Sequence, residues 1–536
     1  MIGFAERTGF LSLVLHAHLP FVRHPEHSDM MEERWLFEAI TETYIPLIQI
    51  FSKLLDDGVR FRLTMSVTPP LANMLSDELL KQRYLAYINK LIVLAEKECQ
   101  RTMLMPELHA NARLYRQKFG EALRTFESWQ NNLVNAFAFF QKAGVLEIIT
   151  CCATHGYLPL MQHQPESVNA QIEMAVKDYR KHFGCDPKGI WLAECAYFPG
   201  VERFLARHGI RYFFVDTHGI LYADPRPTMG VYAPIECPTG VCAFGRDVES
   251  SRQVWSAHEG YPGDFFYREF YRDIGFDLDK EYLHPFMHET GIRLNTGIKY
   301  HRITSRDHDQ KEVYDFHRAM ERVATHAGHF IECREKQARH LAATLGRKPV
   351  VVSPYDAELF GHWWYEGPEF IHQLLRKISL ESSVLGLATP SDYLELYPKS
   401  QKATPSLSSW GHRGYNEFWL DESNDWIYPH QHKATERMIE MCHRFPDATG
   451  LQKRALNQAA REVLLLQSSD WAFILRNNTT VEYARKRVED HTFRFNRLYE
   501  YICGQSISER WLAEVERRDN IFPELDYRIF KGQETL

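Results

Sequence analysis

Residues 10–18 read FLSLVLHAH, a continuous apolar run that ends in polar residues. Such a run predicts a strand that is buried on both faces, as strands of parallel sheets are. A helix is predicted next at Trp35–Asp56, and a second strand at Arg60–Val67 ends in the helix and strand breaker Thr68-Pro69-Pro70. This strand–helix–strand order indicates an α/β fold with a parallel sheet.

The same alternation continues along the chain. A doubly wound sheet would more often carry a Gly-rich phosphate-binding turn after its first strand, and the sequence has none there, so a barrel is the favoured architecture. The further strands are predicted at 145–150, 189–192, 211–215, 350–353 and 384–388, with helices such as 168–183 and 201–208 between them.

Three segments depart from this alternation. Residues 76–120 are a charged helical insert after the second strand, and 312–346 form a long helical arm rich in Glu, Arg, His and Ala. From 429 to 507 the pattern is helical, and the Lys-, Ser-, Thr- and Pro-containing stretch 398–409 precedes it. We therefore expect a catalytic domain at 1–75 and 121–400, an inserted helical domain at 76–120 and a helical C-terminal domain at 401–536.

Composition narrows the class of protein. The 536 residues are 44% hydrophobic and 25% charged, as in ordinary globular proteins, and the net charge of -7 offers no basic surface for nucleic acid or anionic lipid. The N-terminal residues do not resemble a signal peptide, and no apolar stretch approaches the roughly 18 residues of a membrane span. Ten cysteines without a CxxC pair indicate reduced thiols, so we expect a cytoplasmic protein with no membrane or nucleic-acid partner.

Polar groups stand at the ends of the predicted strands. Because the active site of a parallel α/β barrel lies at the C-terminal ends of its strands, these side chains are expected to share one rim. They are His16 and His18, His155, Glu194, Asp216 and Asp356.

His16 and His18 alternate with the period of a strand, so both imidazoles are expected on one face. They could form half of a metal site, completed by His155 and Asp356. They could equally be hydrogen-bonding groups that hold a polar substrate. The sequence leaves the two interpretations open.

Glu194 and Asp356 each follow an apolar strand and have aromatic neighbours. Cleavage of a glycosidic bond needs two such carboxyl groups, one at the anomeric carbon and one to protonate the leaving oxygen. Aromatic side chains supply stacking surfaces for sugars, and their low polarity raises the pKa of the acid. Glu194 alone would fit a buried structural carboxylate paired with arginine equally well; the whole set of strand-end residues favours catalysis.

Several tryptophans lie outside periodic segments. Trp410 and Trp419 are nine positions apart in a Gly-containing stretch, and Trp255 lies in a similar one. Loops on a rigid scaffold are where binding groups concentrate, so these side chains are candidates for substrate contacts. Trp471, on a helical stretch next to Asp470, is expected in the core.

Five stretches of the chain resemble, in order, the motifs of glycoside hydrolase family 57, and in particular its α-1,4-glucan branching members. HAHLP resembles the first motif, WLAECAY the third and PYDAELFGHWW the fourth; CATHGYLPL resembles the second as branching members have it, and SSDWAF the fifth. The resemblance covers nearly the whole chain. It implies a distorted parallel (β/α)7 barrel with an inserted helical domain and a C-terminal all-helical domain.

The resemblance also implies a mechanism. Glu194 corresponds to the nucleophile and Asp356 to the general acid/base of a retaining enzyme, without a metal or any other cofactor. Trp255, Trp410 and Trp419 stand at positions like those of glucan-binding tryptophans, and Tyr232 is a candidate for the tyrosine of a mobile lid in the loop 224–244. The expected substrate-binding set is completed by His16, His18, His155, Asp470, Glu358 and Arg252.

We therefore expect a 1,4-α-glucan branching enzyme that cleaves α-1,4-glucan and transfers the chain to a 6-hydroxyl, as in glycogen-type biosynthesis. An α-amylase or a 4-α-glucanotransferase of the same family is the first alternative, because these activities share one nucleophile and differ in the acceptor. A metal-dependent hydrolase or deacetylase using His16, His18 and Asp356 is a more distant alternative, and a non-catalytic glucan-binding protein fits the two carboxylates least. The expected partner is the glucan, and the expected oligomeric state is a monomer.

Overall fold

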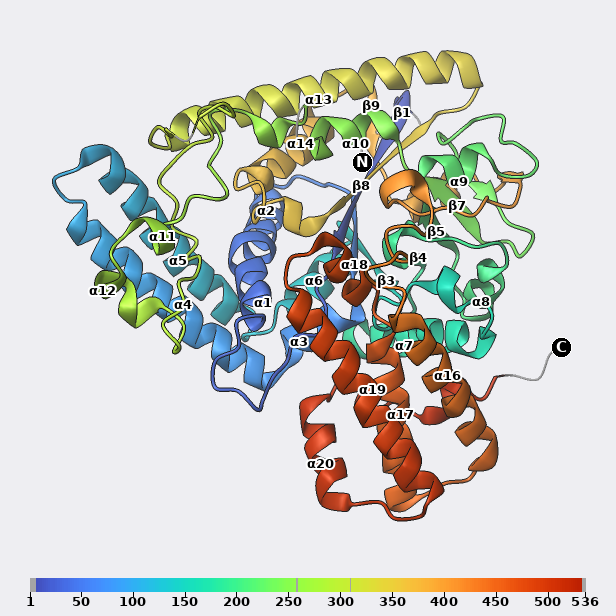
Figure 1. Cartoon of the computed structure of the whole chain (residues 1–536). Helices are drawn as coiled ribbons and strands as arrows, with labels where there is room; N and C mark the ends of the chain where they lie inside the picture. The colour runs from blue at the N-terminus through green and yellow to red at the C-terminus, as the bar shows by residue number, and fades with distance from the viewer. Residues whose placement is uncertain (1–5, 257–258, 309, 533–536) are drawn as a thin grey trace.

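The computed structural model describes residues 6–256, 259–308 and 310–532. A curled, mainly parallel sheet lies at the centre and helices surround it (Figure 1). The strand order is β10-β6-β7-β5-β4-β3-β2-β1-β8, and β9 pairs with β1. The α/β class predicted from the apolar runs is thereby confirmed.

The central strand is β1 (Gly9–Ala17), and all nine of its residues are buried. It pairs in parallel with β2 (Leu63–Val67) on one side and β8 (Val350–Asp356) on the other. The register places His16 opposite Asp356, so two strand ends that are distant in sequence bring candidate site residues together. The start of β1 also pairs with β9 (Leu385–Leu387).

The remaining strands continue the sheet from β2. Seven parallel strands follow one another from β7 to β8, and beyond the end of β7 the Asp247 amide donates to the Val352 carbonyl at 2.9 Å. The sheet therefore curls back toward its own edge, while a closed (β/α)7 barrel stays a prediction. The strands are β3 (Leu146–Cys151), β4 (Gly189–Trp191), β5 (Tyr212–Val215), β6 (Ile235–Glu236), β7 (Cys242–Gly245) and β10 (Gln401–Lys402).

All seven strands predicted from sequence are present, shifted by at most a few residues. The prediction missed β7, because its four residues, CAFG, fall in a segment interpreted as a loop and are too short to show a period. It also missed the two-residue strands β6 and β10.

The predicted helix 35–56 is interrupted by one π-helical turn. It consists of α1 (Glu33–Ala39), the π-helix η2 (Ile40–Tyr44) and α2 (Ile45–Asp56). Such π-turns are rare and often lie at functional sites. The other helices and turns around the sheet are α3 (Pro69–Ser76), α6 (Leu133–Lys142), η3 (Leu158–Met161), α7 (Pro165–Phe183), η4 (Ala193–Cys195), α8 (Val201–Arg207), α9 (Thr217–Leu221), α10 (Val248–Trp255), η7 (Ala357–Leu359), α14 (Gly367–Leu380) and α15 (Pro390–Leu396).

Two long helices, α4 (Glu78–Arg101) and α5 (Pro106–Ser128), pack against each other at one side of the molecule (Figure 1). The irregular segment before α13 lies against them: Tyr282 and Tyr300 both donate to the buried carboxylate of Glu98. This second layer is formed by η5 (Tyr261–Gly263), α11 (Ile274–Asp277), α12 (Lys280–Leu283) and η6 (His284–Phe286). The predicted helical insert is thus present as α4 and α5, while the boundaries of the domains stay predictions.

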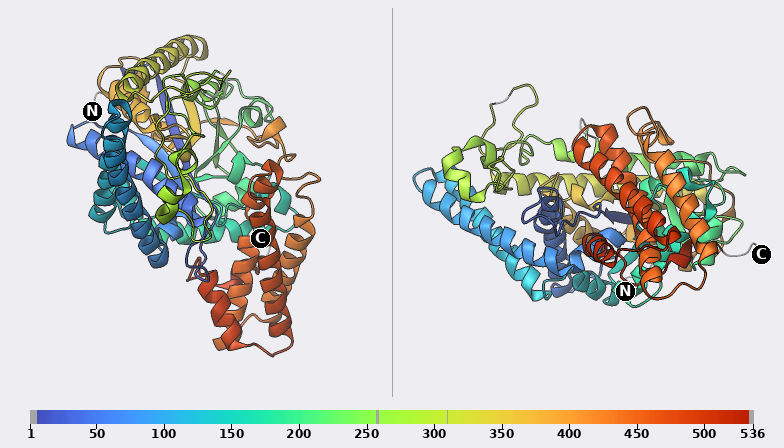
Figure 2. Two further views of the ribbon diagram at one scale, coloured as in Figure 1. Left: turned by 60° about the vertical axis from the view of Figure 1, so that its left-hand side comes forward. Right: turned by 60° about the horizontal axis from the view of Figure 1, so that its bottom comes forward.

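The helical arm predicted at 312–346 is α13 (Phe316–Leu345), which runs along one edge of the sheet (Figure 1). The C-terminal helices form a separate group away from α4 and α5 (Figures 1 and 2). They are α16 (Ile427–Arg444), α17 (Gly450–Leu466), α18 (Ser469–Asn477), α19 (Val481–Cys503) and α20 (Glu509–Arg518), with the short turns η8 (His412–Gly414) and η9 (Tyr527–Phe530). A backbone bridge between Gly156 and Ser468 brings the start of α18 to the end of β3. Among the described residues, none of the helices has the length and hydropathy needed to cross a membrane.

Candidate active site

Glu194 lies just after β4, in a turn with an uncommon backbone. Its φ is +63° and that of Cys195 is +50°, the left-handed region that residues other than glycine rarely adopt. Such conformations cost on the order of 1–3 kcal/mol and cluster at functional sites. His155, which follows β3, has a φ of +59° as well. The chain therefore accepts local strain at two of the predicted site residues.

The carboxylate of Glu194 is 8% exposed and is held by two donors from the C-terminal part of the chain. Trp410 Nε1 donates to Oε2 at 2.8 Å, and Ser469 Oγ donates to Oε1 at 3.0 Å. The Trp410 amide also donates to the Glu194 carbonyl at 3.0 Å. Segments more than 200 residues apart in sequence therefore fix one carboxylate.

These contacts set the pKa of Glu194. Burial raises it to about 7, whereas the hydrogen bonds from Trp410 and Ser469 oppose that rise by favouring the charged form. The group can thus be ionised near neutral pH, as an attacking carboxylate must be.

Asp356 ends β8 and lies opposite His16 in the sheet register. Burial raises its pKa well above the ordinary value, and the charges of Glu358 and Glu194 raise it further, while Arg246 lowers it. An ionised Glu194 therefore helps Asp356 keep its proton. A charged carboxylate beside a protonated one is the pairing that glycosidic cleavage requires.

The three histidines form a stacked group at the ends of β1 and β3. The rings of His18 and His155 stack with centroids 3.7 Å apart, and His16 Nε2 lies 3.1 Å from His155 Nε2. His16 also stacks on Trp191 at 4.8 Å. The prediction that His16 and His18 face the same side is confirmed by their stacked rings, 5.6 Å apart.

Each ring nitrogen of these histidines has a hydrogen-bond partner. His16 Nδ1 contacts Ser66 Oγ, His18 Nδ1 contacts Thr68 Oγ1, and His155 Nδ1 contacts Ser469 Oγ, at 3.2, 3.0 and 2.8 Å. Burial lowers the pKa of His16 and of His155 well below 6.5, so both are neutral. This arrangement favours the hydrogen-bonding interpretation of the histidines.

The metal alternative proposed from the sequence joined His16 and His18 to His155 and Asp356. Among these four residues, within the described part of the chain, only His18 and His155 belong to a group with ligand atoms within 4.8 Å of one another, and Asp470 is its third member. In that group His18 Nε2 already contacts the Asp470 carboxylate at 3.0 Å. An ion there would have to replace this ion pair and the His16–His155 contact, so the set fits a metal poorly.

Asp470 and Glu358 both contact His18, Asp470 through the imidazole and Glu358 through the backbone amide. Although burial opposes it, the charge of Asp470 raises the pKa of His18, and His18 in turn holds the pKa of Asp470 down to about 2. Glu358 accepts from the His18 amide at 3.2 Å and from the hydroxyl of Tyr44, at the end of η2. Both predicted residues therefore lie at the rim and orient the His18 imidazole, whose charged form Asp470 favours.

The predicted tryptophans occupy different environments. Trp410 touches Glu194 directly and packs against Trp191, with ring centroids 4.9 Å apart. Trp419 is 1% exposed and stacks on Tyr157 at 4.6 Å. Trp255 ends α10 and is 39% exposed. Trp471 is buried, as expected, and donates to the Leu465 carbonyl.

Tyr232 and Arg252 lie together at a separate cavity of about 570 Å³. Its walls also include Thr217, which follows β5, and Asp247, which follows β7. Arg252 is exposed and paired with Glu259 at 3.0 Å, whereas the hydroxyl of Tyr232 accepts from Gln337 at 3.5 Å. The cavity nevertheless opens at the C-terminal ends of two strands.

Three neighbours of the carboxylates were not predicted as site residues. Ser469 bonds both Glu194 and His155; Tyr44 donates to Glu358; Arg246 faces Asp216 at 3.3 Å and lies 5.9 Å from the Trp410 ring. Ser469 directly precedes the predicted residue Asp470 in SSDW, but a serine there fits a helix cap equally well. From the sequence, Tyr44 would be assigned to the hydrophobic core. Only its position in the π-helical turn distinguishes it from other core tyrosines.

Replacing Trp410 by phenylalanine is expected to move the acidic limb of the pH profile of kcat/KM upward by about one pH unit. The wild-type limb should fall near pH 7, where Glu194 ionises. A hydrogen bond to a charged group contributes about 1.5–3 kcal/mol, and its loss disfavours the carboxylate form. Initial rates across pH 5–9 measure the shift. Trp129→Phe, at the C-terminus of α5, is the matched control and should leave the limb in place; an unmoved limb in Trp410→Phe would contradict the assignment.

Comparisons with known proteins agree with this geometry. Residues 12–346 match the family model described as "Glycosyl hydrolase family 57", and 430–530 match "1,4-alpha-glucan branching enzyme, C-terminal". A 1,4-alpha-glucan branching enzyme of Thermococcus kodakarensis is 36% identical over 96% of this chain and 77% of its own. Among solved structures, an alpha-amylase from Thermotoga maritima is 48% identical with a TM-score of 0.93, covering 98% of this chain and 100% of the other. A branching enzyme from Pyrococcus horikoshii is 34% identical with a TM-score of 0.88, covering 98% and 97%.

Proposed function

Because the chain belongs to glycosyl hydrolase family 57 and is an enzyme that transfers glucan chains, we propose that it is a retaining 1,4-α-glucan branching enzyme. It cleaves an α-1,4 bond and joins the released chain to a 6-hydroxyl of a second glucan. The observation that carries the proposal is the pair formed by Glu194, fixed by Trp410 and Ser469, and the protonated Asp356 beside it.

The reaction has two steps. In the first, the Glu194 carboxylate attacks the anomeric carbon, the bond from that carbon to the leaving 4-oxygen breaks, and Asp356 donates its proton to that oxygen. In the second, the 6-hydroxyl of the acceptor attacks the same carbon, Asp356 takes the hydroxyl proton, and Glu194 leaves as a carboxylate. Two displacements at one carbon retain its configuration.

The surrounding side chains hold the sugar at the cleavage point. To bind sugar hydroxyls, His16 and His155 would exchange the contact between their Nε2 atoms, and His18 its contact with Asp470, for hydrogen bonds to the substrate. Glu358 and Asp470 fix the orientation of His18. This division of roles is supported by the hydrogen-bonded group at the ends of β1 and β3.

The acceptor glucan is proposed to bind beside the catalytic pair. The cavity lined by Tyr232 and Arg252 and the exposed face of Trp255 are available for it, and Trp410 shields Glu194 on that side. Trp419 is buried and stacks on Tyr157, so its proposed role is to hold the loop that carries Trp410 and not to touch the glucan. Exclusion of water at this point is what makes transfer faster than hydrolysis.

An α-amylase is the second candidate, because the solved structure of that name shares 48% of its sequence with this chain. Hydrolysis and branching use the same first step and differ only in whether water or a 6-hydroxyl attacks in the second. The acceptor, and not the carboxylates, therefore decides between the two.

The deciding experiment is incubation of the purified enzyme with amylose, followed by debranching and counting of the α-1,6 linkages and the new reducing ends. We expect branch points to exceed reducing ends that are formed by hydrolysis. Glu194→Gln, treated identically, supplies the blank. Reducing ends without branch points would contradict branching and leave the α-amylase; products lengthened without branches would indicate a 4-α-glucanotransferase.

We further propose that the enzyme acts in the cytoplasm as a monomer on glycogen-type glucan. The negative net charge and the ten free thiols support this setting. Sedimentation at two protein concentrations tests the oligomeric state.

A further inference from the structure

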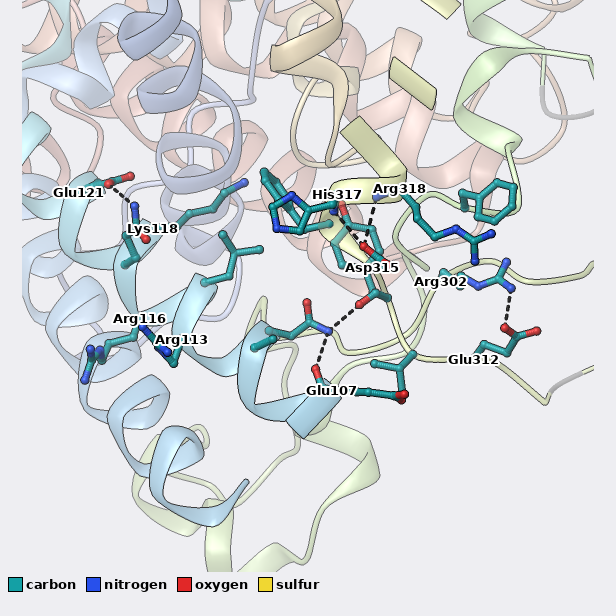
Figure 3. Close-up of a pocket in the computed structure, with 18 of the residues that line it drawn as sticks. Glu107, Arg113, Arg116, Lys118, Glu121, Arg302, Glu312, Asp315, His317 and Arg318 are labelled. Atoms are coloured by element: carbon teal, nitrogen blue, oxygen red, sulfur yellow. Dashed lines mark hydrogen bonds and ion pairs between the residues drawn. The ribbon is translucent and has the colours of Figure 1, made fainter. Parts of the chain in front are cut away.

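A large cavity lies between α5 and the segment that leads into α13 (Figure 3). Its volume is about 1420 Å³, and its lining includes none of the candidate active-site residues. One wall is the face of α5 from Glu107 to Arg124, and the other is formed by residues 311–318 with Phe266 and Arg302.

The charge of this cavity is opposite to that of the whole protein. The chain has 63 basic and 70 acidic residues, whereas seven basic and four acidic residues line the cavity. The basic residues are Arg113, Arg116, Lys118, Arg124, Arg302, Lys311 and Arg318, and the acidic ones are Glu107, Glu121, Glu312 and Asp315. A local excess of cations raises the concentration of anions at the cavity.

Most of the acidic groups are already engaged. Glu312 pairs with Arg302 at 2.6 Å, and Glu121 accepts from Gln117 at 2.9 Å. Asp315 caps α13 by accepting from the amides of His317 and Arg318. These carboxylates are therefore not free to neutralise the remaining cations.

Four arginines of the cavity have no such partner. Within residues 6–256, 259–308 and 310–532, no ion pair to a carboxylate is formed by Arg113, Arg116, Arg124 or Arg318. Arg318 instead lies over the Phe266 ring at 5.0 Å or less, together with Arg302. The guanidinium groups on both walls thus remain available to an anion from outside (Figure 3).

Lys118 also lines the cavity, but the groups around its ammonium, Arg268 and Tyr365, line a smaller neighbouring pocket. Its ammonium lies 4.0 Å from the centroid of the Tyr365 ring. Burial, together with the charge of the nearby Arg268, lowers its pKa to about 8. The arginines, and not this lysine, are therefore the candidate anion ligands of the cavity.

We propose that this cavity is a binding site for a phosphorylated small molecule, held by arginines from α5 and from the start of α13. A guanidinium group binds two phosphoryl oxygens at once through paired hydrogen bonds. A neutral glucan carries no anionic group and therefore cannot bind in this way. Ligand pockets typically measure about 300–1000 Å³, so the cavity has room for a sugar phosphate or a nucleotide. The proposal rests on the cavity and not on the branching activity.

Calorimetric titration of the full-length protein tests this site. The probes are inorganic pyrophosphate, a hexose phosphate and a nucleoside diphosphate, with maltose as the neutral control. We expect at least one phosphorylated probe to bind with one site per chain, and the affinity to fall as salt is added. The hexose phosphate and the nucleotide arms distinguish which organic group the cavity prefers.

The variant Arg113→Gln/Arg318→Gln removes one unpaired cation from each wall. Because both side chains are exposed, the fold should be retained, and we expect binding to weaken about tenfold or more. Arg339→Gln, on α13 outside the cavity, is the matched control and should bind as the wild type does. Arg116→Gln supplies an independent second variant. Failure of all three phosphorylated probes to bind, or equal binding by the double variant, would overturn the proposal without affecting the active-site assignment.

Discussion

Glu194→Gln is expected to reduce chain transfer by about 10⁴-fold or more. The substitution keeps the size of the side chain and one oxygen for Trp410 or Ser469, but it removes the charge that attacks the anomeric carbon. Both steps of the reaction pass through that carboxylate, so branching and hydrolysis should be lost together. Rates with amylose at pH 8, where the wild-type group is ionised, measure the loss.

The control for this variant is Glu202→Gln. Glu202 is also a buried glutamate, and one of its oxygens accepts from Tyr197 and from the Gly200 amide, which a glutamine oxygen can also do. This variant should keep wild-type activity. If Glu194→Gln remained within about tenfold of the wild type, another group would have to be the nucleophile.

Asp356→Asn is expected to lose about 10²–10⁴-fold with amylose, because the leaving 4-oxygen then receives no proton. With an α-maltosyl fluoride the expected result is different. Fluoride leaves as an anion without protonation, so Glu194 can still form the intermediate, and release of the sugar from it is slow without a base. We therefore predict that fluoride release shows a burst of about one fluoride per enzyme molecule, followed by a slow phase.

Two further proteins make the fluoride experiment decisive. Glu194→Gln should give no burst with the same donor. Asp178→Asn, a buried aspartate that accepts from Asn73, should behave as the wild type does with both substrates. If Asp356→Asn lost the fluoride substrate as completely as amylose, Asp356 would not be the acid/base.

The sheet could be predicted from sequence because its strands are apolar on both faces. FLSLVLHAH has no competing helical period, and the structure gives all nine residues of β1 as buried. In β7 four residues were too few for such a pattern. The layer between α10 and α13 was not predicted either, because its tyrosines are fixed by distant partners such as Glu98, which no local pattern reveals.

Residues of the candidate site could be predicted where an ionisable side chain directly follows a predicted strand. Glu194 alone fitted a structural carboxylate equally well, but the whole set of polar groups after buried strands, together with the family resemblance, selected Glu194, Asp356 and the histidines from the sequence. Ser469, Tyr44 and Arg246 could not be predicted, because serine, tyrosine and arginine are common in caps, cores and ion pairs. Ser469 contacts Glu194 across 275 residues of sequence, and Tyr44 contacts Glu358 across 314. Arg246 is held by Asp216 at the end of the next strand of the sheet, so only the folded chain brings these residues together.

The most direct test of the central claim is to trap the intermediate. A 5-fluoro-α-glucosyl fluoride forms the glycosyl–enzyme because fluoride leaves readily, while the ring fluorine slows its release by destabilising the oxocarbenium-like transition state. Mass spectrometry of the intact protein and of its peptides then locates the adduct. We predict one glycosyl ester per chain, on Glu194. An adduct on any other residue, or turnover without an adduct and with inverted configuration at the anomeric carbon, would contradict a retaining mechanism through Glu194.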